Sequence, residues 1–384
     1  MELNKSFSVK DAIFILTYTL PLTLSMAVCA GMGAFAGAVF ACIAAFICGA
    51  VEEKKQVPVY ASFLTVTYTF REFGASTTAL AVAVCGILLA LSWKYKSSQK
   101  LDMLGKSPIN GSVMLLSALT VTILFTTDYF GIGASGNTAR EIIASYLSLG
   151  FHPNWRGVLY GTIVMVVMIT FPRKFKKATQ IVSAAFIALI ITTALNFWLN
   201  PSDMITSIRE IGVLSFYDYK NSILFPVLNS KPEIFHALFC GISLYLICLY
   251  MILQNPNRKK SDFIIGGISN CLAGFSTCMI IPNITRKNKL ISGIIASLLT
   301  GIIFFVCNDF IARIPVHSCA VVLIVGAWQS VKWSEVKKIF SSALNIAFFV
   351  LITIVCLLLG YIYTPLIAFI VLEMYSRTSL KIKK

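Results

Sequence analysis

Residues 57–70 read VPVYASFLTVTYTF, and residues 281–286 read IPNITR. Both stretches are apolar segments that open at a proline, Pro58 in one and Pro282 in the other. As a helix, the first would extend about 21 Å, which is too short to cross the ~30 Å hydrocarbon core of a bilayer. The second is shorter still. Two half-length helices among full-length ones would define an unusual membrane fold, and the rest of the chain supports this interpretation.

The composition of the chain is that of a membrane protein. Of its 384 residues, 57% are hydrophobic and only 12% are charged, whereas soluble domains carry about 25% charge. The apolar residues form long uninterrupted runs rather than alternating patterns, which indicates helices. Helices also satisfy the backbone polar groups inside a bilayer. We therefore predict an all-α polytopic membrane protein, with the lipid bilayer as its first partner.

About fourteen apolar segments can be marked, including the two half-helices. They span residues 13–30, 34–50, 57–70, 75–93, 111–126, 157–171, 178–199, 235–253, 263–279, a short stretch near Pro282, 290–312, 316–330, 340–359 and 361–375. The first segment is longer than the ~7–15-residue apolar region of a signal peptide, so we predict an uncleaved span. Between segments, residues 138–151 predict an amphipathic outer helix.

The net charge of +16 predicts topology rather than nucleic-acid binding, because no soluble basic domain is visible. With fourteen crossings and a cytoplasmic N-terminus, the inner loops and both termini hold 25 of the 32 Lys and Arg residues (2+2+4+4+3+3+3+4). Basic residues concentrate on the cytoplasmic side of membrane proteins. Both termini are therefore predicted to be cytoplasmic, in the bacterial inner (plasma) membrane, with residues 376–384 as a short tail.

The positions of the two short segments predict an inverted repeat. Each is the third segment in a set of seven, one in residues 1–199 and the other in 235–384, with 200–234 as an extracytoplasmic linker. Because seven is odd, two such halves insert in opposite orientations. Short, proline-interrupted segments at matching places in two halves point to a transport site at the repeat interface.

Enzymatic and metal-dependent functions have little support in the sequence. The histidines stand alone at positions 152, 236 and 317, and the eleven cysteines include no CxxC pair, so no metal cluster is expected. Membrane transferases need paired acids or a His with an acid, and no such motif is present. We expect no catalytic residue, metal or cofactor.

Several stretches resemble the sulfate permease (SulP) family of anion transporters. The strongest similarity covers residues 309–340, including the run IPVHSCAVVLIVGAW and the basic stretch VKKIF at 336–340. A second covers 266–286, with Asn270 and Thr285-Arg286 at matching positions. A third covers Leu20-Pro21 and residues 31–49. The resemblance spans most of the chain and is weak at any single position.

The resemblance implies a seven-plus-seven fold with core and gate domains, and a substrate held between the facing N-termini of the third and tenth helices. Candidate contacts are Val59, Tyr60, Ala61 and Ser62 on one side and Asn283, Ile284, Thr285 and Arg286 on the other. Helix starts carry partial positive charge and free N–H groups, and an arginine adds a bidentate fork for an oxyanion. The competing interpretation makes Arg286 a topology charge of the loop RKNK.

The chain departs from the family in four places. Leu22 replaces a glutamine, residues 241–253 lack an acidic residue, few residues follow Arg286 before the next segment, and no cytoplasmic STAS domain is expected. We predict a secondary transporter or exchanger of a small inorganic anion such as sulfate, bicarbonate or chloride, with a homodimer as a possible assembly. The alternatives are a nucleobase permease of the same fold, an anion channel, and a non-transporting membrane subunit.

Overall fold

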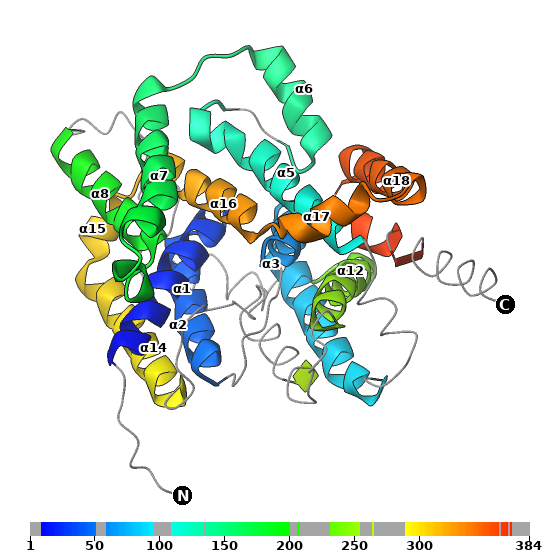
Figure 1. Ribbon diagram of the computed structural model, residues 1–384, viewed down its shortest axis with the longest axis horizontal. Coiled ribbons are helices and arrows are strands. Elements are labelled where there is room, and N and C mark those ends of the chain that lie inside the picture. The colour runs from blue at the N-terminus through cyan, green and yellow to red at the C-terminus, as the bar shows by residue number, and fades with distance from the viewer. Residues whose placement is uncertain are drawn as a thin grey trace, which may run out of the picture.

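The computed structural model describes residues 9–50, 59–95, 109–133, 136–199, 206–207, 231–253, 263–264, 289–360, 362–367 and 369–370. Helices dominate this part of the chain (Figure 1). They are α1 (Val9–Ala30), α2 (Ala34–Ala50), α3 (Val59–Ser92), α5 (Ile109–Phe130), α6 (Ala139–Leu149), α7 (Trp155–Lys174), α8 (Ala184–Leu199), α12 (Ile234–Leu253), α14 (Lys289–Val306), α15 (Asn308–Ala312), α16 (Val316–Ser330), α17 (Trp333–Ile339) and α18 (Ala343–Leu359), with the 3-10 turns η1 (Trp93–Tyr95) and η2 (Ala178–Gln180).

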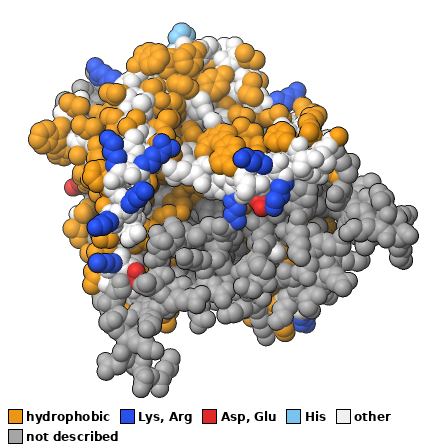
Figure 2. Space-filling view, viewed as in Figure 1, with side chains coloured by type: hydrophobic (Ala, Val, Ile, Leu, Met, Phe, Trp, Pro, Cys, Tyr) orange, Lys and Arg blue, Asp and Glu red, His pale blue; other side chains and the backbone are white. Residues whose placement is uncertain are grey.

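Helix length and polarity suit a bilayer. Among the described residues, four helices are long and apolar enough to cross it, namely those in α1, α3, α5 and α7, and six shorter apolar helices accompany them. Large apolar side chains remain exposed on the outside of the helix assembly, for example Leu298 and Val306 on α14. A soluble protein would bury such side chains, and a bilayer accommodates them. Figure 2 shows hydrophobic side chains covering much of one face, with Lys and Arg in clusters.

Helix α1 lies at the centre of the packing. It packs against α2, α8, α14 and α16 (Figure 1), and nearly all its side chains are buried. The hydroxyls of Thr19 and Thr23 donate to backbone carbonyls one turn earlier, at 2.9 Å each, so burial leaves them satisfied. An apolar sequence on every face of the helix is what this central position requires.

The predicted segments 57–70 and 75–93 form the two parts of α3. Helical geometry breaks at Gly74, whose φ of 79° and ψ of −179° divide the element. Glycine reaches a positive φ without the steric cost that a Cβ brings. The first part is therefore a short helix, as predicted. The second part packs closely on α12, where Gly241 lies against the Ala81 carbonyl and Ser92 hydrogen-bonds Tyr245 at 2.7 Å.

Two parts of the chain repeat one pattern of helices. In α5–α6–α7 and in α16–α17–α18, a short helix separates two longer apolar ones. The predicted amphipathic helix at 138–151 is confirmed as α6, whose first turn is capped because the Glu141 N–H donates to the Thr138 hydroxyl at 3.3 Å. The basic stretch at 336–340 largely coincides with the short helix α17. This internal correspondence fits the inverted repeat.

The structure differs from the predicted segments at two places. The segment predicted at 178–199 begins with η2, and α8 starts only at Ala184, because the Ser183 hydroxyl donates to the Thr17 carbonyl and accepts from the Phe186 N–H. The segment predicted at 290–312 ends as α14 at Val306 and continues as α15. Residues 265–288, with the stretch near Pro282, and residues 361, 368 and 371–375 lie outside the described residues.

Candidate functional site

The first turn of α3 is buried inside the helix assembly. Tyr60, Ala61 and Ser62 are 7%, 0% and 0% exposed, and Val59 opens the helix. The first four N–H groups of a helix have no partner within it, so this turn brings partial positive charge into an apolar interior. Half of the predicted binding residues therefore share one buried helix start.

The other predicted half lies outside the described residues. Asn283, Ile284, Thr285 and Arg286 fall within residues 265–288. Their approach to the first turn of α3 thus stays a prediction.

The start of α3 packs against α16 and α5. The Tyr60 hydroxyl lies so close to Gly326 of α16 that a Cβ at that position would overlap it. On the next turn, Phe63 stacks on Phe125 of α5, with ring centroids 5.7 Å apart. Sequence analysis missed Gly326, because a glycine in an apolar run shows nothing of which side chain approaches it.

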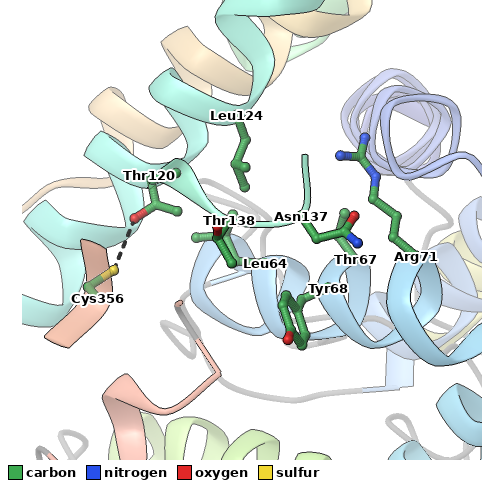
Figure 3. Close-up of a pocket in the computed structure, with 10 residues that line it drawn as sticks. Leu64, Thr67, Tyr68, Arg71, Thr120, Leu124, Asn137, Thr138 and Cys356 are labelled. Atoms are coloured by element: carbon green, nitrogen blue, oxygen red, sulfur yellow. Dashed lines mark hydrogen bonds between the residues drawn. The ribbon is translucent and has the colours of Figure 1, made fainter. Parts of the chain in front are cut away.

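A pocket follows the same helix away from its start (Figure 3). Leu64, Thr67, Tyr68 and Arg71 line it from one face of α3, at spacings of three and four residues. The opposite wall consists of Thr120 and Leu124 of α5, residues Asn137–Ala139 at the start of α6, and Cys356 of α18. The pocket thus brings one face of α3 together with residues of α5, α6 and α18, which are distant from it in the sequence.

Polar groups of α3 point toward this pocket. The Thr67 hydroxyl is buried and has no hydrogen-bond partner, although Thr65 and Thr69 on the same helix bond to carbonyls one turn earlier. The Arg71 guanidinium donates to the Cys29 carbonyl at 2.5 Å, at the C-terminal end of α1. A cation suits this position because the last carbonyls of a helix carry partial negative charge.

Asn137 lines the pocket and links α3 to α6. Its side-chain N–H donates to a Glu72 carboxylate oxygen at 2.5 Å, and its backbone N–H donates to Glu141 at 2.8 Å. Glu72 belongs to α3 and Glu141 to α6, so one asparagine joins the two elements. Charge patterning could not predict this contact, because Asn137 is neutral and lies in the connection between α5 and α6.

His317, at the start of α16, holds α16 against the end of α5 and the start of α7. Its imidazole Nδ1 lies 2.6 Å from the Asp128 carbonyl at the end of α5, and its ring fits against Gly131 and Gly157. A side chain at Gly157 would overlap that ring. Within the described residues, no three His, Cys, Asp or Glu side chains gather as a metal site would require.

These features define an all-α polytopic membrane protein with a buried helix start and, further along the same helix, a pocket lined by both polar and apolar side chains. The sequence matches no protein-family model and no curated protein. Solved structures do match. The transmembrane domain of a cyanobacterium bicarbonate transporter, BicA, is 14% identical with a TM-score of 0.69, over 93% of this chain and 96% of that one.

Two further structures share the fold. SLC26A9 is 13% identical with a TM-score of 0.60, over 96% of this chain and 65% of that one. Murine Slc26a9, an anion transporter captured in the inward-facing state, is 12% identical with a TM-score of 0.64, over 98% and 69%. The chain therefore has the predicted seven-plus-seven inverted-repeat transporter fold, with core and gate domains.

Proposed function

We propose that this chain is a secondary transporter or exchanger of small inorganic anions, in the class of sulfate, bicarbonate or chloride, and a distant member of the SulP family. The observation that carries the proposal is the buried first turn of α3, which begins inside the molecule at Tyr60–Ser62. Two of the structures that share the fold, a bicarbonate transporter and an anion transporter, agree with this assignment.

The proposed site uses backbone charge instead of a buried lysine. The N–H groups at the start of α3 face an anion from one side, and those of the predicted tenth helix face it from the other. Two helix starts meeting in mid-membrane are a recurrent anion site in inverted-repeat transporters. Arg286 would supply a full charge and two parallel N–H donors. This arrangement binds an oxyanion without the desolvation cost of an unpaired ammonium group.

The absence of charge in α12 favours exchange or uniport. Helix α12 reads IFHALFCGISLYLICLYMIL and contains no Asp or Glu. A nucleobase permease of the same fold would need a carboxylate there to bind the base, so this alternative is less favoured. A proton-coupled mechanism also needs a titratable acid within the membrane. We therefore propose that transport needs no inward proton movement; an anion channel is the second candidate.

Uptake into proteoliposomes tests the proposal. Purified protein should accumulate labelled sulfate, bicarbonate or chloride when vesicles are preloaded with an unlabelled anion, and a protonophore at clamped voltage should leave uptake unchanged. Protein-free vesicles and a labelled nucleobase serve as controls. Nucleobase uptake without anion uptake would overturn the proposal, and uptake that collapses with the protonophore would overturn the coupling mode. Flux that persists without a counter-anion, and that does not saturate as the concentration of any tested anion is raised, would favour the channel.

A further inference from the structure

The turn between α7 and α8 gathers positive charge on a short stretch. Arg173 and Lys174 end α7, Lys176 and Lys177 follow, and the exposed ring of Phe175 lies between the two pairs. All four cations are exposed. None forms an ion pair with a carboxylate of the described residues. Figure 2 shows Lys and Arg side chains gathered over the end of α7. Four cations within five residues create a strongly positive local electrostatic potential, which attracts an anion.

This basic turn, residues 173–177, is held in a fixed shape. The Phe175 N–H donates to the Phe171 carbonyl at 2.9 Å, and the Thr179 N–H donates to the Phe175 carbonyl at 3.0 Å. Ser183 then anchors the end of the turn on α1, where its N–H donates to the Thr17 hydroxyl at 3.2 Å. These hydrogen bonds hold the backbone of the turn and so keep the four basic side chains attached at neighbouring points. The turn therefore presents its four cations from one ordered stretch of backbone.

An apolar stripe on α7 leads to the basic turn. Leu159, Val166 and Ile169 are 58%, 53% and 38% exposed and follow one another along a face of the helix. At 1.5 Å per residue, the ten positions from Leu159 to Ile169 extend about 15 Å. Phe175, 56% exposed, continues the apolar surface into the cationic turn. An apolar stripe that ends among cations is complementary to a single anionic lipid, whose acyl chains are apolar and whose headgroup is negatively charged.

We propose that the basic turn and the stripe on α7 bind an anionic glycerophospholipid. Its phosphate lies among Arg173, Lys174, Lys176 and Lys177, and its acyl chains lie along Leu159, Val166 and Ile169. Basic residues at the membrane surface attract anionic headgroups. Phe175 and the stripe distinguish a lipid from free phosphate, because only a lipid gains from apolar contact. The site is independent of the anion pathway at α3.

Native mass spectrometry of the full chain, released from nanodiscs, tests this site. With phosphatidylglycerol and phosphatidylcholine of the same acyl length, the protein should retain phosphatidylglycerol preferentially. Lys176→Gln should lower that preference about fivefold, the equivalent of about 1 kcal/mol. Lys174→Gln/Lys176→Gln/Lys177→Gln should lower it more than tenfold. Arg173 stays in place in both variants, so that a basic residue still marks this side of the membrane.

The matched control is Lys337→Gln/Lys338→Gln on α17. There the Lys338 ammonium lies 2.8 Å from a Glu335 carboxylate oxygen, so an ion pair already offsets its charge. This variant should keep the preference of the native chain. Equal retention by the native chain, or an equal loss in the control, would overturn the proposal.

A second variant separates a lipid from a diffuse counterion cloud. Phe175→Ser keeps all four cations and should still reduce retention of phosphatidylglycerol severalfold, because the apolar link between stripe and turn is lost. If Phe175→Ser changes nothing, or if inorganic phosphate displaces phosphatidylglycerol completely, the occupant is not a lipid. Equal melting temperatures in phosphatidylcholine nanodiscs show that each variant is folded. No arm depends on anion transport, so failure here leaves the proposed function untouched.

Discussion

At the scale of single residues, Arg286 is the sharpest test of the proposed anion site. A helix start offers a charge about 0.3–1 kcal/mol, and up to about 2 kcal/mol when partly buried, while a charge-assisted hydrogen bond contributes about 1.5–3 kcal/mol. Arg286→Ala should therefore weaken anion binding about tenfold or more, since about 1.4 kcal/mol is one decade. Arg286→Lys should recover only part, because an ammonium group cannot fork onto two oxygens. Equilibrium binding to purified protein measures both.

The neighbouring loop residues provide the controls for this prediction. Lys287→Ala and Lys289→Ala should leave affinity unchanged, because solvated loop charges contribute little to a buried ligand. Thr285→Val should weaken binding slightly, through one lost hydroxyl donor. If Arg286→Ala behaves like Lys289→Ala, the arginine is a topology charge and the site does not use it.

Gly326 and Tyr60 provide a second residue-scale prediction. A methyl group at Gly326 would overlap the Tyr60 hydroxyl, and overpacking a buried contact costs about 1–3 kcal/mol. Gly326→Ala should therefore lower the free energy of unfolding by about that amount. Tyr60→Phe removes the overlapping oxygen, so the double variant should be more stable than Gly326→Ala alone. Denaturant unfolding in detergent measures this, and strictly additive effects would show that the two residues do not meet.

At the scale of elements, the break in α3 shapes the region of the proposed site. The first part of α3 is short because the helix begins at Val59, next to the buried Tyr60, and Gly74 ends regular helical geometry. One face of that part, from Leu64 to Arg71, then lines the pocket. The pocket therefore lies on the helix whose start is proposed to hold the anion, and we expect the Asn137 contact at its edge to keep it closed.

The Asn137 contact predicts how this closure can be loosened. Its hydrogen bond to Glu72 is exposed, so its loss should cost about 0.5–1.5 kcal/mol. Cys356 lines the pocket beneath it and is buried, which makes it a native reporter. Asn137→Ala should raise the rate at which an impermeant maleimide, added outside, labels Cys356 by about two- to tenfold.

Two variants control this labelling experiment. Asn345→Ala removes a comparable side-chain hydrogen bond, to the Lys338 carbonyl at 3.1 Å, at the opposite end of α18. It should leave the labelling rate unchanged. Cys307 is exposed and should be labelled in every variant. Cys356→Ser should therefore abolish only the increase that Asn137→Ala causes, and so identify Cys356 as its source. An unchanged rate in Asn137→Ala would mean that Asn137 does not hold the pocket closed.

At the scale of the whole molecule, the distribution of basic residues predicts the orientation. With 25 of 32 Lys and Arg residues on one side in the fourteen-segment scheme, both termini should be cytoplasmic. A reporter fused after Lys384 should therefore be active in the cytoplasm, and one inserted within residues 200–234 should be active outside. Activity of both reporters on the same side would contradict the segment count.

The sequence by itself determined the class of molecule, most helix positions and the short third segment. Those features are local, because long apolar runs, prolines and glycines record helix positions and lengths directly. The amphipathic α6 was predicted for the same reason, since its cap and its apolar face lie within fourteen residues.

Only the tertiary structure decided which groups meet. The overlap of Tyr60 with Gly326, the bridge from Asn137 to Glu72, and the late start of α8 at Ser183 join residues far apart in the chain. Nothing in the local sequence identifies the partner in these contacts, because glycine, asparagine and serine each occur in many structural environments. Helix packing brings such residues together, and their pairing therefore becomes visible only when the helices are placed in space.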